Sequence, residues 1–257
     1  MENKPISVIK QMFVDGEINE EIIGQLKNDK RKGVQTLLQQ YEKRKQKEKQ
    51  QLEHFKMMLH YENEAKNKGY RTIAGVDEAG RGPLAGPVVA AAVILPDDFL
   101  LLGLDDSKKL TEKQREYFFE KIKEEAISYH IAVKSNETID RMNILEATKS
   151  AMYEAISGLD TKPDYVLVDA VALPKLPVSS EVIIKGDAKC ISIAAASILA
   201  KVTRDRMMKR IHEEFPMYDF KSNMGYGTKR HMESIKTYGV SPYHRKTFAP
   251  IRNIIGH

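Results

Sequence analysis

The sequence predicts an α/β fold preceded by a helical N-terminal extension. Residues 1 to about 70 show apolar spacing typical of helices, whereas strand-like and helix-like segments alternate from Arg71 onward. The longest apolar run, Val88–Leu95, is long enough for a buried strand and has prolines on both sides. We therefore divide the chain into a helical extension, residues 1–70, and a larger α/β domain, residues 71–257, which ends in a helical part.

The composition is that of a soluble protein, with 42% hydrophobic and 30% charged residues. The apolar runs are much shorter than the ~20 residues of a membrane span, and the first residues contain no apolar signal segment. Cys190 is the only cysteine, which excludes a disulfide within the chain. We expect a cytoplasmic protein without membrane contact. A formal charge of +5 is weak evidence for a polyanionic partner, so the motifs must decide.

The extension contains a polar run, residues 42–50, inside its last helical pattern. The run is typical of a solvated helix face, but it can also supply extra contacts to nucleic-acid phosphates. Its basic residues are Lys43, Arg44, Lys45, Lys47 and Lys49. The sequence leaves both interpretations open.

The second domain shows strand and helix signals in alternation. Thr111 and Gln114 form a capping box, which predicts a helix beginning there and ending near Ser128. The predicted strands are a short run from Arg71 and residues 88–95, 129–134, 165–169 and 181–185; the further predicted helices span about 138–159 and 188–210, with a short one ending near 238.

Acidic residues stand at or just beyond the ends of three predicted strands. They are Asp77 with Glu78, then Asp169, then Asp187. If these strand ends converge in a sheet, the carboxylates repel one another unless divalent cations neutralise them. Hard oxygen ligands suit Mg²⁺ or Mn²⁺, and two such ions can activate a water and stabilise the leaving oxygen of a phosphodiester. The spacing thus favours metal-assisted hydrolysis.

Each of these acids also has a purely structural interpretation. A single aspartate at a strand end is commonly a turn former or a helix cap, and Asp187 directly precedes a predicted helix. Glu78 faces away from Asp77 in a regular strand, so a shared ion needs a local break, which Gly80 and Gly82 permit. Other catalytic patterns fit worse, because the histidines form no His-x-x-x-His pair and Cys190 is typical of a small packed residue at a helix start.

Six segments in a fixed order carry a family resemblance: residues 75–88 (GVDEAGRGPLAGPV), 106–110 (DSKKL), 168–170 (VDA), 185–189 (KGDAK), 192–197 (SIAAAS) and 225–228 (GYGT). Together they resemble the type 2 ribonucleases H, in particular bacterial ribonuclease HII. The resemblance covers about Arg71 to Pro250. It implies a ribonuclease H-like mixed sheet flanked by helices, so that residues 71–257 would be the catalytic domain.

The resemblance also implies an activity and its metal ligands. The activity is endonucleolytic hydrolysis of RNA in RNA–DNA hybrids and cleavage 5′ of ribonucleotides embedded in duplex DNA, giving 5′-phosphomonoesters. The family's four acidic ligands for Mn²⁺ or Mg²⁺ correspond to Asp77, Glu78, Asp169 and Asp187. A monomer is expected.

Substrate-binding roles follow from the same resemblance. Gly80, Arg81 and Gly82 correspond to the family's element that contacts the strand around the ribonucleotide, and Tyr226 to the tyrosine that stacks on the neighbouring deoxyribose. Lys108 and Lys109 are expected phosphate contacts, although they can simply precede a helix. Arg81 favours ribonuclease HII over ribonuclease HIII, which usually has lysine there. The resemblance assigns no role to residues 1–70.

A nucleic-acid-binding module without hydrolysis is the competing interpretation. It accounts for the positive charge and for the basic run at residues 43–49. It leaves the four carboxylates unexplained, so we favour the nuclease.

Overall fold

A computed structural model describes residues 4–256. The chain divides into two compact units, residues 1–56 and 57–257. The boundary therefore lies earlier than the predicted limit at residue 70. Within the described residues, none of the helices is both long and apolar enough to cross a membrane.

The first unit is helical, as predicted. It contains α1 (Ile6–Asp15), α2 (Glu20–Lys27) and most of α3 (Lys32–Met58). Gly16 ends α1 with a φ of +76°, and the Asn19 side chain caps α2. Pro5 precedes α1. The helices enclose a small apolar core made of Ile9, Phe13, Leu26, Val34 and Leu38.

The basic run lies on α3 with its charge partly neutralised by the same helix. Arg44 and Lys45 lie 3.8 and 3.5 Å from Glu48 carboxylate oxygens, and Lys49 lies 4.0 Å from Glu53. Pairs of this kind are typical of a solvated helix surface. Phosphate binding by the run stays a prediction.

The second unit is built on a mixed five-stranded sheet with the strand order β3-β2-β1-β4-β5. The strands are β1 (Ile73–Ala79), β2 (Val88–Ile94), β3 (Ser128–Lys134), β4 (Tyr165–Asp169) and β5 (Ser179–Ile183). Strands β1, β2 and β3 pair antiparallel, whereas β1, β4 and β5 pair parallel. The predicted mixed sheet is confirmed, with the fifth strand beginning before its predicted start at residue 181.

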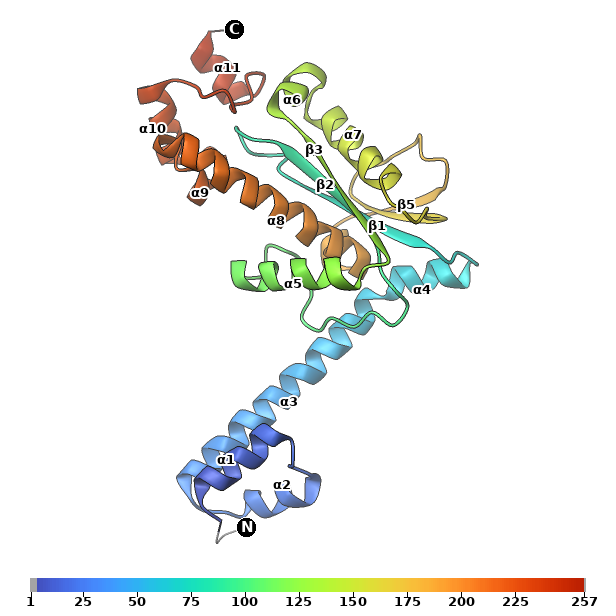
Figure 1. The fold of residues 1–257 in the computed structure, drawn as a ribbon, viewed down its shortest axis with the longest axis vertical. Coiled ribbons are helices and arrows are strands. Elements are labelled where there is room, and N and C mark those ends of the chain that lie inside the picture. Colours follow the sequence, from blue (N-terminus) through green and yellow to red (C-terminus); the bar gives the residue numbers. More distant parts are fainter. Residues whose placement is uncertain (1–3, 257) are drawn as a thin grey trace. The chain divides into compact units, whose positions relative to one another are not determined.

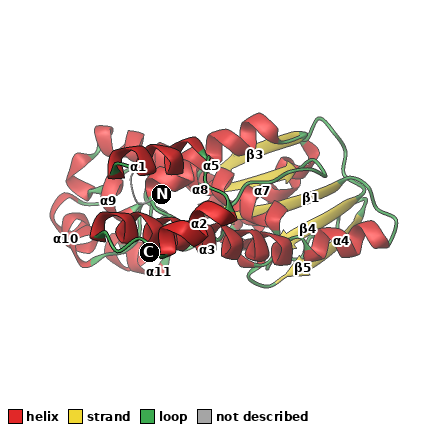
Figure 2. Cartoon of the chain, turned by 90° about the horizontal axis from the view of Figure 1, so that it is seen from below, coloured by secondary structure: helices red, strands yellow, loops and turns green. Residues whose placement is uncertain are grey.

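Helices cover both faces of this sheet (Figures 1 and 2). Helix α8 (Ile191–Glu214) packs on β1 and β2 and against α5 (Glu112–Glu125), and α7 (Ile144–Ser157) packs on β2 and β3 from the other side. The remaining helices are α4 (His60–Asn67), α6 (Asn136–Met142), α9 (Phe220–Asn223), α10 (Lys229–Tyr238) and α11 (Ala249–Ile255), with short 3₁₀ turns η1 (Gly186–Ala188) and η2 (Pro216–Tyr218).

Two helix predictions need correction, and one cap is confirmed. The segment predicted as one helix over 138–159 is split into α6 and α7, because Asn143 adopts a φ of +69° between them. The helix predicted from 188 begins at Ile191, after the η1 turn. The capping box of Thr111 and Gln114 is present at the start of α5.

Helix α8 lies unusually close to the central strand at Gly75. A Cβ atom on Gly75 would stand 2.2 Å from the backbone carbonyl carbon of Ser192, which no side chain tolerates. This contact brings the first turn of α8 close to β1 two residues before Asp77.

The contacts of α4 explain why the structural boundary precedes residue 70. Glu62 is buried, and its Oε1 accepts hydrogen bonds from the Ser192 N–H at 2.9 Å, the Ser192 hydroxyl at 2.7 Å and the Cys190 thiol at 3.1 Å. Glu62 thus caps the start of α8 from a different helix. Tyr61 and Ala65 also pack into a core cluster with Ile73. Residues 57–70 therefore complete the sheet domain.

We predict that Glu62→Ala lowers the free energy of unfolding by about 1–3 kcal/mol, because the first turn of α8 loses a buried acceptor. Thermal unfolding would show a melting temperature lower by roughly 2–4 °C for each kcal/mol lost. Glu62→Gln keeps an acceptor oxygen and should lose less, and Glu64→Ala, at an exposed position on α4, is the control. A wild-type melting temperature for Glu62→Ala would contradict the capping role.

Candidate active site

Asp77 and Glu78 lie near the end of β1, where its parallel neighbour β4 also ends. The pairing of β1 with β4 stops at Val76 opposite Val168, so Asp77 and Asp169 follow side by side at the carboxyl ends of two parallel strands. The antiparallel pairing with β2 continues through Glu78 to Ala79. The anticipated break comes only afterwards, at Gly80 with a φ of +100°.

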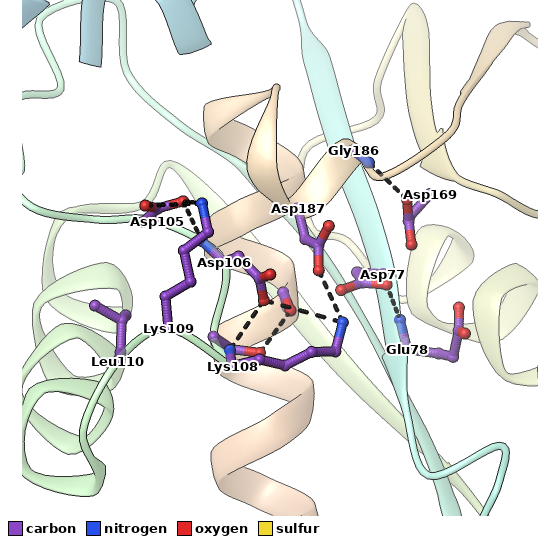
Figure 3. Close-up of polar contacts among 12 residues, drawn as sticks. Asp77, Glu78, Asp105, Asp106, Lys108, Lys109, Leu110, Asp169, Gly186 and Asp187 are labelled. Atoms are coloured by element: carbon purple, nitrogen blue, oxygen red, sulfur yellow. Dashed lines mark hydrogen bonds and ion pairs between the residues drawn. The ribbon is translucent and has the colours of Figure 1, made fainter. Parts of the chain in front are cut away.

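The η1 turn brings the third strand end to the same place. The Gly186 N–H donates to Asp169 Oδ1 at 2.7 Å, and the next residue is Asp187. Asp187 in turn accepts a hydrogen bond from Lys108 Nζ at 3.0 Å (Figure 3). The sheet therefore gathers acids that are up to 110 positions apart in the sequence, as their positions at strand ends predict.

Asp77, Glu78 and Asp169 line one cleft, and Asp187 is linked to it through Lys108, which also lines the cleft. Among residues 4–256, no three His, Cys, Asp or Glu side chains already stand in a ligand arrangement around one point. Side-chain rotation at this edge would be needed for all four acids to share bound ions.

Burial and mutual repulsion raise the pKa values of the three acids that line this cleft. Burial raises the pKa of Asp77 well above its usual range, and the neighbouring charges of Glu78 and Asp169 raise it further. Burial also raises the pKa of Glu78, against the opposing effect of Arg81. Burial raises the pKa of Asp169 in spite of the hydrogen bond from Gly186. The cleft thus favours any positive charge that enters it.

One carboxylate oxygen in the cleft has no partner among the described residues. Glu78 Oε1 lies 3.3 Å from Arg81 Nη1, but Glu78 Oε2 is buried without a hydrogen bond. A buried, unpaired carboxylate oxygen is costly unless a cation or donor reaches it. Together with the all-oxygen donor set, this atom fits a hard divalent cation.

The expected substrate-binding residues divide into two groups. Gly80, Arg81, Gly82, Lys108 and Tyr226 line the cleft with the acids. Lys109 does not, because its Nζ contacts the Asp105 carboxylate at 3.0 Å on the other side of the loop (Figure 3).

Tyr226 stands opposite the glycine-rich loop. Half of the side chain is exposed, at 50%, and its Cε1 atom would lie 3.5 Å from a Cβ built on Gly82. An aromatic ring thus faces a backbone segment without a side chain, across the cleft that holds the acids. This arrangement suits the stacking role implied by the resemblance.

Comparison with known proteins identifies the family. The family model described as Ribonuclease HII matches residues 74–251, and the model Ribonuclease HII N-terminal domain matches residues 5–66. The chain belongs to the ribonuclease HII family. Ribonuclease HII of Oceanobacillus iheyensis is 56% identical over 250 residues, which cover 96% of each chain. Membership in this family supports ribonuclease H activity.

Solved structures agree with the fold. The crystal structure of ribonuclease H2 from Pyrococcus horikoshii OT3 is similar with a TM-score of 0.63 and 31% identity, covering 72% of this chain and 97% of that one. The structure of Bst-RNase HIII in complex with Mn²⁺ has a TM-score of 0.57 and 17% identity, covering 72% of this chain and 69% of that one. At that identity the second likeness shows the fold alone.

Two buried arginines that the sequence did not single out support the ribonuclease HII cleft. Arg204 on α8 and Arg245 are 1% and 0% exposed. Arg204 donates to the backbone carbonyls of Pro87, Ala85 and Met224 at 2.9–3.1 Å. Arg245 donates to the carbonyls of four residues, namely Gly80, Arg81, Gly86 and Pro87. Hydrogen bonds from these two buried guanidinium groups therefore fix the backbone of the loop that contains Gly80, Arg81 and Gly82.

Close packing against α8 explains why the loop has glycine at positions 80 and 86. A Cβ on Gly80 would stand 2.1 Å from Arg204 Nε, and one on Gly86 would stand 2.3 Å from Met208 Sδ. Burial lowers the pKa of Arg204 to about 10, and burial with repulsion from Arg204 lowers that of Arg245 to about 9. Both groups keep their charge at neutral pH. No local pattern in the sequence marks an arginine as buried, because its partners are backbone carbonyls of a distant loop.

We predict that Arg245→Met lowers the free energy of unfolding by about 2–3 kcal/mol, because several buried carbonyls lose their donor at once. Arg245→Lys should be nearly as damaging, since an ammonium cannot reproduce the planar fork of donors. Urea unfolding measures the loss, and Arg252→Met, at an exposed position, is the control. Equal stability of Arg245→Met and Arg252→Met would contradict the support role.

A second prediction concerns how the stability of the protein depends on pH when a chelator keeps the cleft free of metal ions. The folded pKa of Asp77 is raised above its ordinary 3.8, so the folded protein holds a proton that the unfolded chain releases. Stability should therefore fall as the pH rises from about 4 through the raised pKa. Asp77→Asn removes one of the repelling charges, so this variant should be more stable than wild type at pH 7 and show a flatter pH dependence.

Urea unfolding in EDTA between pH 4 and 8 tests this expectation. Asp98→Asn, at an exposed position, controls for the general loss of one negative charge. A wild-type protein that becomes steadily more stable as the pH rises would show that the acids are not held in a repulsive cluster.

Proposed function

We propose that this ribonuclease HII is a divalent-metal-dependent endoribonuclease that hydrolyses the RNA strand of RNA–DNA hybrids and cleaves 5′ of ribonucleotides embedded in duplex DNA. The observation that carries the proposal is the meeting of Asp77, Glu78 and Asp169 in one cleft, with Asp187 joined to it through Lys108. A nucleic-acid-binding module has no use for such a cluster, because carboxylates repel phosphates.

Asp77, Glu78, Asp169 and Asp187 are the residues that would hold Mg²⁺ or Mn²⁺. When bound, such ions activate a water molecule for attack on the scissile phosphorus and stabilise the oxygen that leaves. The unpaired Oε2 of Glu78 and the raised pKa values of three of the acids support this assignment. The carboxylate ligands do not discriminate between Mg²⁺ and Mn²⁺, since both ions bind oxygen ligands.

The other residues of the cleft orient the acids and the strand. Ser197 lines the cleft and partly offsets the rise in the pKa of Asp77, and its hydroxyl lies 3.1 Å from the Ser107 hydroxyl. Burial alone would lower the pKa of Lys108, but its hydrogen bond to Asp187 raises it, so the ammonium stays charged. Lys108 and Arg81 thus provide positive charge where the scissile phosphate must approach a cluster of acids.

Recognition of the ribonucleotide is assigned to the opposite wall of the cleft. The backbone of Gly80 and Gly82 can approach a sugar closely, and a 2′-hydroxyl provides a donor and an acceptor that distinguish RNA from DNA. Tyr226 would stack on the neighbouring sugar, and the half-exposed ring supports this role. Hydrolysis would break the bond between phosphorus and the 3′ oxygen of the preceding nucleotide, and the 5′-phosphate would remain on the ribonucleotide.

We predict that Asp77→Asn and Asp169→Asn reduce cleavage by at least about 10³-fold, because each removes a ligand charge needed for metal-assisted hydrolysis. The assay uses a labelled DNA duplex with one ribonucleotide, with Mg²⁺, with Mn²⁺ or with EDTA. Wild type should cut 5′ of the ribonucleotide only when a metal is present.

Asp98→Asn is the matched control and should cut at the wild-type rate. Binding of the duplex by wild type without any cleavage would support the binding module instead. Full activity of Asp77→Asn would show that the acids are not the catalytic centre.

A further inference from the structure

Two buried histidines lie behind the cleft and have no part in the mechanism above. His231 on α10 and His244 are both 0% exposed, and their Nε2 atoms are 3.0 Å apart. Tyr218 and Phe220 pack edge-on against them, with ring centroids 5.0 Å from His244 and 5.3 Å from His231, respectively. Imidazole nitrogens buried in such an apolar setting need hydrogen-bond partners, because an unpaired buried polar group is costly.

The protons of this pair follow from the backbone groups at its two ends. The Ser241 N–H can only donate, so His244 Nδ1, 2.8 Å away, must be the acceptor and carry no proton. The remaining proton of His244 is then on Nε2 and points to His231 Nε2. His231 therefore carries its own proton on Nδ1, which donates to the Tyr226 carbonyl at 2.8 Å. The Ser241 N–H at one end and the Tyr226 carbonyl at the other therefore require the same arrangement of protons.

This chain ends on the residue that faces the cleft. The Tyr226 carbonyl accepts from His231 and from the Thr228 N–H at 2.8 Å, which leaves the peptide little freedom to rotate. Burial lowers the pKa of His231, and burial with repulsion from His231 lowers that of His244 to about 4. The pair stays neutral around pH 7 and keeps the single arrangement of protons.

The pair also ties Tyr226 to the glycine-rich loop. His244 forms an isolated backbone bridge with Ala85, and the Arg245 N–H donates to the Leu84 carbonyl at 2.8 Å. The Leu84 N–H donates in turn to the Gly225 carbonyl at 2.8 Å, next to Tyr226. The histidines thus close a ring of hydrogen bonds that joins the segment around Tyr226 to the glycine-rich loop with Gly82.

We propose that the His231–His244 pair is a positioning element that fixes Tyr226 opposite Gly82 and so sets the preference of the enzyme for a single ribonucleotide embedded in DNA. The inference rests on the proposed function and names residues that influence which substrate the enzyme prefers. His231 and His244 touch no substrate and act through Tyr226. A shift of the Tyr226 backbone would move its ring away from the sugar that it is placed to contact, while the acids on the sheet would keep their positions.

The test is a double-mutant cycle read as a ratio of activities. For each variant, kcat/KM is measured on a duplex with one ribonucleotide and on a uniform RNA–DNA hybrid. His231→Leu should lower the ratio of the two values about tenfold, the scale of one lost buried hydrogen bond. Tyr226→Ala should lower it at least as much, and the double variant should be no worse than Tyr226→Ala, because His231 acts through that residue.

His231→Asn is the conservative variant, since its amide can still donate to the Tyr226 carbonyl. It should restore most of the ratio that His231→Leu loses. General destabilisation cannot imitate this result, because a smaller folded fraction lowers both activities equally. An unchanged ratio in His231→Leu, additive losses in the double variant, or no effect of Tyr226→Ala in an active enzyme would each overturn the inference.

A measurement on the wild-type protein keeps the inference testable if His231→Leu fails to fold. Nitrogen NMR of histidine-labelled protein should show His231 protonated on Nδ1 and His244 on Nε2, and both neutral at pH 7. The opposite tautomers, or a charged ring, would overturn it. Absence of metal-dependent cleavage by wild type on both substrates would instead refute the proposed function.

Discussion

The cleft depends on one unfavourable interaction, the burial of several carboxylates at a single edge of the sheet. Asp77 and Asp169 are neighbours because β1 and β4 are parallel and end together, and the η1 turn adds Asp187. Burial and the repulsion of neighbouring charges raise the pKa values of Asp77 and Asp169. Many other features of the site follow from the need to hold this arrangement together.

Two pairs of positive side chains lie around the cleft, and they have different partners. Lys108 and Arg81 reach the carboxylates directly, at 3.0 and 3.3 Å from their oxygens. Arg204 and Arg245 lie deeper and bind backbone carbonyls of the glycine-rich loop. The first pair lies where a substrate phosphate would arrive, whereas the second pair shapes the loop. Separate residues therefore supply charge to the cleft and rigidity to its wall.

The walls of the cleft come from distant parts of the chain that are joined by short polar contacts. The glycine-rich loop, the segment around Tyr226 and the segment that follows α10 meet through backbone hydrogen bonds and through His231 and His244. Such a connection transmits position rather than charge, because the two imidazoles are neutral. On this proposal, the position of Tyr226 can change while the acids on the strands keep theirs.

Local patterns in the sequence determined much of this protein. Alternating strand and helix signals predicted the α/β fold, and the capping box at Thr111 predicted where α5 begins. Acids at strand ends predicted the acidic cluster, because a strand end can be recognised from neighbouring residues. The family resemblance pointed to Arg81 and Tyr226, which do line the cleft. Only the tertiary structure decided that Glu62 belongs to the sheet domain, that Lys109 points away, and that Arg204, Arg245 and the histidine pair support the cleft. The physical reason is that Glu62, Arg204 and Arg245 take their roles from partners many residues away, several of them backbone groups, which leave no periodicity or spacing in the sequence. Lys109 and the two histidines have nearer partners, but the loops that bring these groups together have no regular spacing either.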